Sequence, residues 1–181
     1  MYYSTKYSSP LGMITIACDK NKLVGLWIDG QKYHGDSIVE LNGANESSVP
    51  LLGEVKKWLD KYFSGKKPSI SDLPLAPAGG SEFRKKVWNI LCEIPYGKVI
   101  TYGDIAKEIA AKTKTNKMSG QAVGRAVGHN PISIIIPCHR VVGANGNLTG
   151  YAGGIEKKIK LLELEGVDMS KLYVPKKGTA L

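Results

Sequence analysis

The sequence predicts an α/β protein in two parts, with strands and a helix first and a mostly helical part after them. Two short apolar runs, 11–18 and 23–28, are separated by a polar turn, a pattern typical of paired strands. Residues 51–63 then place apolar side chains at helical spacing. From residue 81 onward helical spacing recurs in successive segments, each preceded by a capping residue.

A proline- and glycine-rich stretch separates the two parts. Pro68, Pro74 and Pro77 are followed by Gly79-Gly80, which favours an extended connection over a helix or strand. The 181 residues suffice for one large domain or two small ones. We therefore expect an N-terminal α/β domain over 1–73, a linker over 74–81, a C-terminal domain over 82–166 and a basic tail over 167–181.

Three helices are expected in the second part. Ser81 can cap the first, which Pro95 ends. Thr101 with Asp104 three residues later matches a capping box and predicts the start of the second. The third is predicted over Ser119–Gly128, so the last two would form a helix-turn-helix with a long turn. Most two-helix pairs bind no DNA, so this pattern alone does not assign a function.

The third of these segments has an unusual composition, because Gly120, Gly124 and Gly128 recur every four residues. Glycine costs up to ~1 kcal/mol relative to alanine inside a helix, so a repeated glycine needs a reason. One interpretation is tight packing against a neighbouring helix, and the other is close approach of a nucleic-acid backbone. Gln121 and Arg125 exclude the pairing of membrane helices that such spacing serves elsewhere.

Positive charge is concentrated in the second part. Residues 1–81 carry nine Lys/Arg and eight Asp/Glu, a net of +1, whereas 82–166 carry thirteen and seven, a net of +6. Residues 167–181 add three and one, a net of +2, which completes the total of +9. This distribution favours a polyanionic partner, although basic surfaces also serve solubility alone.

The cysteines exclude a disulfide framework. Cys18, Cys92 and Cys138 are odd in number and form no CxxC pair, so neither a disulfide-rich fold nor a zinc knuckle is indicated. No apolar run reaches the ~18 residues of a membrane span, and the N-terminus lacks the apolar core of a signal peptide. We expect a soluble, intracellular and reduced protein.

The segment Ser133–Val142 carries the candidate chemistry. Its apolar pattern predicts a buried strand, which Pro137 interrupts because proline cannot donate a ladder hydrogen bond. Cys138 and His139 at this break have the residue types of a thiol site, in which an imidazole takes the proton of the nucleophile. The alternative is a buried structural cysteine beside a surface histidine, because neighbours in a strand point to opposite faces.

The run Ile136-Pro137-Cys138-His139-Arg140-Val141-Val142 resembles the active-site signature of the O6-alkylguanine-DNA alkyltransferases, also called methylated-DNA–protein-cysteine methyltransferases. The resemblance extends over about residues 81–166 in several ordered motifs, which is more specific than one short signature. The further matches are Phe83, Trp88, Pro95-Tyr96-Gly97, Thr101-Tyr102, Ala122-Val123-Gly124, Asn130-Pro131, Tyr151, Gly153-Gly154 and Glu165-Gly166.

The resemblance implies both a fold and an activity. The fold would be a ribonuclease H-like N-terminal domain followed by a winged-helix-like DNA-binding and catalytic domain. The activity would be direct DNA repair, in which the alkyl group of O6-alkylguanine passes irreversibly, in a single turnover, to Cys138. Activity on O4-alkylthymine is left open. No cofactor is implied, and no metal is expected because the zinc ligands of some relatives have no match here.

The resemblance also implies roles for the candidate catalytic residues. Cys138 would be the alkyl acceptor, and His139 would draw its proton through a bound water. Glu165 would hold His139 in the correct tautomer. Asn130 would tie the recognition helix to the cysteine loop, and Tyr102 would act on the phosphate backbone to help rotate the damaged nucleotide out.

DNA contacts are implied for the Ser119–Gly128 helix, which this family lays in the minor groove of double-stranded DNA. Its small side chains suit a groove only ~6 Å wide. Gln121 departs from the family pattern, because an arginine often stands there and replaces the flipped base in the stack. The residues implied for DNA are Gln121, Ala122, Gly124, Arg125 and Tyr102, and those implied for the base pocket are Tyr151 and Val141.

The remaining expectations concern partners and rival functions. We expect a monomer that acts in the cytoplasm without a membrane partner, and Arg140 is expected to support the cysteine loop rather than take part in transfer. One rival function is a catalytically silent damage-binding or regulatory protein on the same scaffold. The other is a thiol hydrolase that uses Cys138, His139 and Glu165, which would turn over repeatedly.

Overall fold

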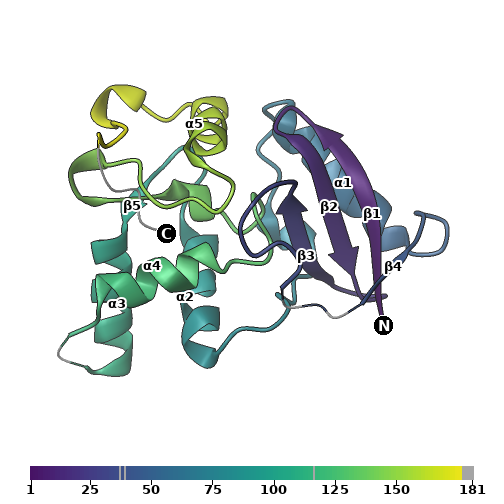
Figure 1. Cartoon of the computed structure of the whole chain (residues 1–181), viewed down its shortest axis with the longest axis horizontal. Helices are drawn as coiled ribbons and strands as arrows, with labels where there is room; N and C mark the ends of the chain where they lie inside the picture. The colour runs from purple at the N-terminus through teal and green to yellow at the C-terminus, as the bar shows by residue number, and fades with distance from the viewer. Residues whose placement is uncertain (37, 39, 116, 177–181) are drawn as a thin grey trace. The chain divides into compact units, whose positions relative to one another are not determined.

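The computed structural model describes residues 1–36, 38, 40–115 and 117–176 (Figure 1). The chain forms two compact units. The first comprises Met1–Gly79 together with Pro131–Ile135, and the second comprises Gly80–Asn130 and the described residues from Ile136 onward. The fold is therefore mixed α/β, with an N-terminal sheet and a mostly helical C-terminal part, as the sequence predicts.

The first unit is a four-stranded sheet with the strand order β3-β2-β1-β4 and one long helix. β2 pairs antiparallel with β1 and with β3, and β4 pairs parallel with β1. Helix α1 packs on β1 and β2. The elements are β1 (Tyr2–Ser9), β2 (Gly12–Cys18), β3 (Leu23–Ile28), β4 (Leu41–Gly43), α1 (Pro50–Phe63) and the 3₁₀ turn η1 (Ile70–Asp72).

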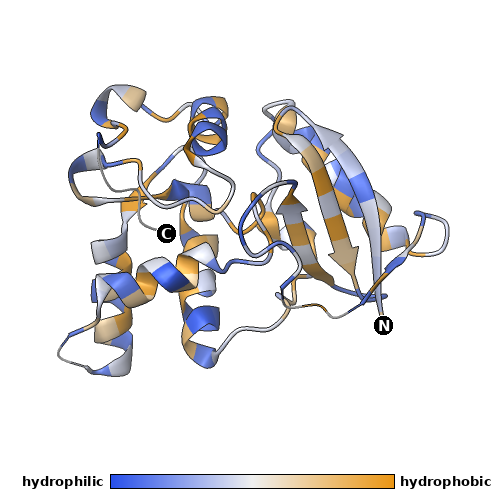
Figure 2. Ribbon diagram, in the orientation of Figure 1, coloured by the Kyte–Doolittle hydropathy of each residue, from blue (hydrophilic) through white to orange (hydrophobic). Residues whose placement is uncertain are grey.

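Apolar character explains which strands the sequence predicts. β2 and β3 are buried along almost their whole length and are the apolar strands of the sheet (Figure 2). β1 was not predicted, because it consists of tyrosine, serine, threonine and lysine and is only partly buried. It is held between β2 and β4 by backbone pairing, which a hydropathy pattern does not reveal.

The segment Pro131–Ile135 belongs to the first unit although it lies between two stretches of the second. Leu26 of β3 donates its N–H to the Pro131 carbonyl at 2.8 Å, and its carbonyl accepts the Ser133 N–H at 2.9 Å. The chain then turns at Ile134, whose φ of 72° is left-handed and rare for a β-branched residue. The strand expected over residues 133–142 is therefore wrong, and only β6 (Val141–Val142) is a strand.

The second unit contains the predicted helices with their predicted caps. Ser81 accepts the Arg84 N–H, Thr101 and Asp104 form the capping box, and Ser119 accepts the Ala122 N–H. Helix α4 lies across α2 and α3, and β5 pairs parallel with β6 (Figure 1). The elements are α2 (Glu82–Glu93), β5 (Ile100–Thr101), α3 (Tyr102–Thr113), α4 (Gly120–Gly128) and the 3₁₀ turns η2 (Cys138–Arg140) and η3 (Ala144–Gly146).

Helix α5 (Ile155–Leu164) and the 3₁₀ turn η4 (Met169–Lys171) complete the second unit. Leu162 of α5 packs with Val142 and Leu148 in a buried cluster. The segment expected only as a basic tail is partly folded, because the Tyr173 carbonyl accepts the Leu148 N–H at 2.8 Å. Residues 177–181 of this tail lie outside the described residues. No helix in the described part of the chain is long and apolar enough to span a bilayer.

Candidate active site

Cys138 begins the 3₁₀ turn η2, directly after Pro137. Its side chain is buried, and its Sγ accepts a hydrogen bond from Asn130 Nδ2 at 3.2 Å. Burial raises the pKa of the thiol, an effect that the Asn130 hydrogen bond partly offsets. Cys138 is therefore a protonated thiol at neutral pH, and it needs a base to become nucleophilic.

His139 follows Cys138 in the chain, and its side chain is fully buried. Its Nε2 lies 2.6 Å from Glu165 Oε1, and the Glu165 side chain is equally buried. Burial lowers the pKa of His139, while the Glu165 carboxylate opposes that effect. With Nε2–H donated to Glu165, Nδ1 is the ring nitrogen that can accept a proton.

The Glu165 carboxylate accepts hydrogen bonds from two segments of the chain. Besides His139, Arg140 donates Nε to Oε2 at 2.8 Å and Nη2 to Oε1 at 3.1 Å, and the Gly97 N–H donates to Oε2 at 3.2 Å. Burial alone would raise the pKa of Glu165, but the hydrogen bonds from His139 and Arg140 outweigh it and hold that pKa well below its ordinary value. Glu165 is therefore a permanently charged orienting group.

The turn Pro95-Tyr96-Gly97 packs against the end of α5. Tyr96 donates its hydroxyl to the Leu164 carbonyl at 3.2 Å. Gly97 has a left-handed φ of 74°, and a Cβ there would lie 2.8 Å from the Glu165 carbonyl oxygen. Only glycine lets this backbone approach the carboxylate and donate to it, which gives a physical reason for this motif.

Asn130 joins the end of α4 to the cysteine loop. Its Nδ2 donates to the Ile136 carbonyl at 2.8 Å as well as to Cys138 Sγ. The Asn130 backbone N–H is bonded to the Val127 carbonyl, which closes the end of the helix. The side chain thus connects the backbone of the loop, the reactive sulfur and α4.

Lys158 is a site residue that the sequence reasoning missed. It lies in α5, and its buried Nζ donates to the carbonyls of Val141 at 2.5 Å and Thr149 at 2.9 Å. Burial lowers its pKa to about 8, and the charge of Cys138 opposes that shift. One signal was present in the sequence: Lys158 shares a helical face with Leu162 and, two turns later, with Glu165.

Tyr102 and Tyr151 are the two candidate tyrosines, and a negative charge on Cys138 acts on the pKa of both. Tyr102 donates its hydroxyl to the Gly150 carbonyl at 2.9 Å and, more weakly, to the Thr149 carbonyl at 3.3 Å. Tyr151 is buried, and its hydroxyl has no hydrogen-bond partner among the described residues. Burial raises the pKa of both phenols, and the charge of Cys138 adds to it. Val141, the other pocket candidate, is fully buried.

Helix α4 presents its small and polar residues outward. Gln121 and Arg125 are exposed, and Ala122 and Gly124 are partly exposed. A Cβ at Gly120 would meet no atom within 4 Å, and one at Gly124 would make only ordinary contact with the Tyr102 ring at 3.9 Å. Packing within the protein therefore does not require glycine at these two positions. This favours the second interpretation of the glycine repeat, which is close approach of a nucleic-acid backbone.

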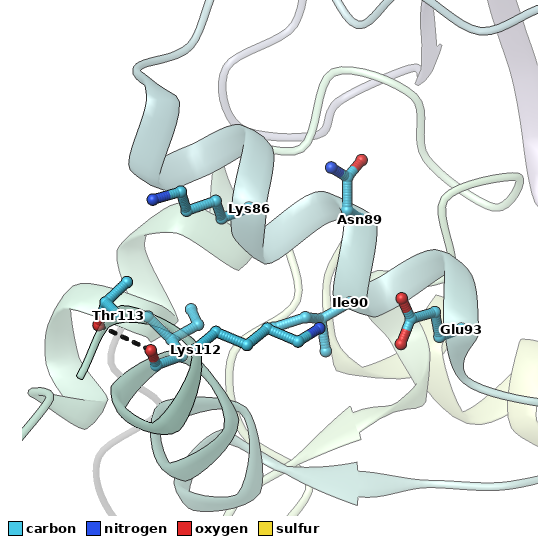
Figure 3. A pocket seen from close by; sticks show the side chains of 7 residues that line it. Lys86, Asn89, Ile90, Glu93, Lys112 and Thr113 are labelled. Carbon is cyan, nitrogen blue, oxygen red and sulfur yellow. Dashed lines mark hydrogen bonds between the residues drawn. The ribbon is translucent and has the colours of Figure 1, made fainter. Parts of the chain in front are cut away.

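One surface hollow of about 290 Å³ lies between α2 and α3 (Figure 3). Its lining contains none of the site residues described above. Within the described residues, no three His, Cys, Asp or Glu side chains gather as a metal site would require. The hollow is lined by Lys86, Asn89, Ile90 and Glu93 of α2 and by Ile109, Lys112 and Thr113 of α3.

Comparison with known proteins identifies the family. Residues 1–77 match the "6-O-methylguanine DNA methyltransferase, ribonuclease-like domain", and residues 82–167 match the "DNA binding domain" of the same family. A methylated-DNA–protein-cysteine methyltransferase of Methanosarcina acetivorans is 44% identical over 170 residues, 92% of this chain and 99% of the relative. One of Haemophilus influenzae is 37% identical over 91% of this chain and 87% of the relative.

A solved structure agrees in fold as well as in sequence. Mycobacterium tuberculosis OGT in complex with DNA has a TM-score of 0.76 and 37% identity, and the match covers 94% of each chain. The two matched domains belong to one family and together span almost the whole chain, and the relative from Methanosarcina acetivorans matches 92% of it. The chain belongs to the 6-O-methylguanine DNA methyltransferase family and is a methylated-DNA–protein-cysteine methyltransferase, a DNA-binding protein that repairs DNA directly by alkyl transfer.

Proposed function

We propose that Cys138 is the alkyl acceptor and that it takes the alkyl group from O6 of alkylguanine in double-stranded DNA. The observation that carries this proposal is the arrangement around the thiol. The sulfur is buried and bonded by Asn130, and the next residue is a histidine whose far ring nitrogen is bonded to Glu165. This arrangement supplies a nucleophile, a base and an orienting carboxylate in the order that thiol activation needs.

The proposed reaction transfers one proton and one alkyl group. His139 Nδ1 accepts the Cys138 proton through a water molecule, and Glu165 stabilises the imidazolium that forms. The thiolate then attacks the alkyl carbon, an S–C bond forms, and the C–O6 bond breaks with its electron pair remaining on the guanine. A proton returns to the guanine, so the thiol hydrogen has in effect replaced the alkyl group. Lys158 lies near enough to favour the thiolate by its charge.

The product explains why the reaction stops after one turnover. A thioether on Cys138 has no leaving group that this base could displace with water, so the acceptor is not regenerated. A burst experiment distinguishes single-turnover alkyl transfer from the activity of a thiol hydrolase. With substrate in excess, transfer should stop at one alkyl group per protein, whereas continued product release would show a turning-over hydrolase and overturn the proposal.

The DNA would lie along α4, with its minor groove over the small outward residues. Tyr102 would act on the backbone beside the damaged base, and Tyr151 and Val141 would line the pocket that receives it. In the structure the Tyr102 hydroxyl is bonded to the 149–150 backbone, so DNA contact would exchange that bond for one to DNA. Support comes from the open space at Gly120 and from the DNA complex of the Mycobacterium tuberculosis relative.

Gly120→Leu tests the minor-groove proposal. The backbone at Gly120 is not left-handed and the space around it is open, so the fold should tolerate leucine. A bulky side chain cannot enter a groove ~6 Å wide beside the helix, so affinity for duplex should fall by about tenfold or more. Binding to duplex and reaction with free O6-benzylguanine would both be measured, and the free-base rate should not change.

Gly43→Leu is the matched control, because Gly43 is also open and lies in β4 of the other unit. It should leave affinity for duplex unchanged. Unchanged duplex affinity in Gly120→Leu would show that α4 does not enter the groove. An equal loss in both variants would mean that neither glycine reports a specific DNA contact.

Gln121→Arg tests how the damaged base is extruded. Glutamine can fill part of the gap and hydrogen-bond the orphaned cytosine, but it lacks the charge and the planar stacking surface of a guanidinium. We expect arginine to speed repair of duplex, where extrusion is costly, and barely to change reaction with single strands or free O6-benzylguanine. Duplex affinity should also fall more steeply with salt. The slope of the logarithm of the binding constant against the logarithm of the salt concentration should become more negative by about 0.9, the value for one more neutralised phosphate.

The two proteins would be compared on duplex, single strand and free base at one salt concentration. Equal acceleration on all three substrates would mean that position 121 acts on the Cys138 site and not on base flipping. An unchanged duplex rate would mean that Gln121 is already an adequate intercalating residue. Gln121 is exposed on α4, so the substitution should not disturb the core.

We further propose that the protein acts as a monomer in the cytoplasm. The basic second part and a reactive free thiol suit a reducing compartment that holds the genome. O4-alkylthymine is a candidate second substrate, because it presents the same kind of alkyl carbon on an exocyclic oxygen. A duplex carrying that base, offered in the burst experiment, would show whether the pocket admits it.

A further inference from the structure

Arg140 is a buried cation whose three guanidinium nitrogens all donate hydrogen bonds. Its guanidinium is almost fully buried, and two of its nitrogens bind the two oxygens of Glu165. The third, Nη1, donates to the Ile94 carbonyl at 2.6 Å, and the Tyr96 ring lies 5.6 Å from its central carbon. A fork of this kind fixes both the position and the plane of the carboxylate.

The same carboxylate binds His139, so two potential cations share one anion. A buried histidine paired with a lone carboxylate is drawn toward the imidazolium form, which could no longer accept a proton. The groups that face His139 are Glu165 and Lys158 from α5, and Arg140 and Cys138 from its own segment. Of these, only Arg140 binds the carboxylate that His139 also binds.

We propose that Arg140 is a positioning residue of the transfer reaction: it fixes the Glu165 carboxylate and offsets its charge, so that His139 waits as a neutral imidazole able to take the Cys138 proton. This inference rests on the proposed role of His139 as the base. It goes beyond support of the loop, because it assigns to the arginine a measurable effect on the protonation state of a neighbouring residue.

The charge effect has a definite sign. Removing the positive charge of Arg140 raises the pKa of His139, because the Glu165 carboxylate then acts on it without opposition. Below that raised pKa the imidazole is already protonated and cannot accept the thiol proton. The acid limb of the transfer rate should therefore move to higher pH by about one unit or more, since a charge within ~4–6 Å changes a pKa by 1–3 units.

The experiment follows His139 directly by NMR with ring-labelled histidine. The chain has only three histidines, and the His139 signal is assigned by its loss in His139→Gln. Wild type, Arg140→Gln and Arg140→Lys would be titrated, and single-turnover transfer from free O6-benzylguanine would be followed over the same pH range. Arg84→Gln, on α2 and outside the site, is the matched control.

In wild type and Arg84→Gln, His139 should stay neutral down to pH values below its ordinary pKa. In Arg140→Gln its pKa should rise by about one unit or more, and the acid limb should follow it. Arg140→Lys keeps the charge but loses the fork, so the pKa should rise by less than about half of that shift while the plateau rate falls. A merely structural arginine would alter stability and leave the titration of His139 unchanged.

The double variant Arg140→Gln/Glu165→Gln keeps the test valid if the single variant does not fold. It removes both buried charges, so His139 should stay neutral, which a raised pKa in this variant would contradict. An unchanged His139 titration in folded Arg140→Gln, with normal transfer in wild type, overturns the inference alone. Absence of transfer to Cys138 in wild type would instead overturn the proposed function.

Discussion

We expect Cys138→Ala to abolish alkyl transfer and to leave duplex binding within about twofold of wild type, because base and phosphate contacts do not involve the thiol. The substitution removes the only buried sulfur that Asn130 bonds, and it leaves the His139–Glu165 pair intact. The measurement is transfer of a labelled methyl group from O6-methylguanine duplex, together with duplex affinity in the same buffer.

Cys18→Ala and Cys92→Ala are the matched controls. Cys18 is buried in β2 and Cys92 lies in α2. Unlike Cys138, neither is followed by a histidine that could take its proton. Both variants should transfer at the wild-type rate. Methyl uptake by Cys138→Ala on either of the other cysteines would refute the assignment of the acceptor.

The second large effect is expected for Glu165→Gln. An amide cannot enforce the His139 tautomer or stabilise the imidazolium, and exchanging an orienting carboxylate for an amide costs ~10⁴-fold in a comparable triad. We expect transfer to slow by about 10²- to 10⁴-fold at neutral pH. Because Arg140 loses its anion, stability should also fall by about 3–5 kcal/mol, as when one partner of a buried ion pair is removed.

Glu163→Gln separates chemistry from a general effect on α5. Glu163 is exposed two residues earlier on the same helix, and its substitution should change neither the transfer rate nor the unfolding midpoint. Single-turnover rates with free O6-benzylguanine would be taken at a temperature where near-UV circular dichroism shows both variants folded. A wild-type rate in folded Glu165→Gln would show that the proton leaves Cys138 by another route.

Local signals were sufficient for much of the fold. Helices α2, α3 and α4 each follow a capping serine or threonine, so the sequence shows where each of them begins. β2 and β3 are mostly apolar runs, as the burial of these two strands requires. These features depend only on neighbours along the chain.

Features that depend on distant partners were not readable. The run at 132–136 is as apolar as a strand, yet its hydrogen bonds go to Leu26, more than a hundred residues away, and the chain turns at Ile134. β1 carries too little apolar character to be found alone. In both cases the pairing partner, and not the local composition, decides the structure.

The site shows the same division. Cys138 and His139 stand out as neighbours beside a proline, but Glu165 and Arg140 look like ordinary surface charges until the end of α5 is packed against η2. Lys158 looks like one more lysine of a charged helix, although it is fully buried. Ion pairs across the fold leave no local pattern. The resemblance implied Glu165, and from the sequence Arg140 was expected only to support the loop, whereas the structure revealed the pairing of Arg140 with Glu165 and the burial of Lys158.

The most direct test of the central claim is the intact mass of the protein after incubation with duplex DNA containing O6-methylguanine. We predict a gain of one methyl group in place of one hydrogen, complete at one equivalent of DNA and mapped by peptide analysis to Cys138. An unchanged mass while the DNA loses its methyl group would contradict it, because the group would then have left the protein. A methyl group mapped to any other residue would contradict it equally.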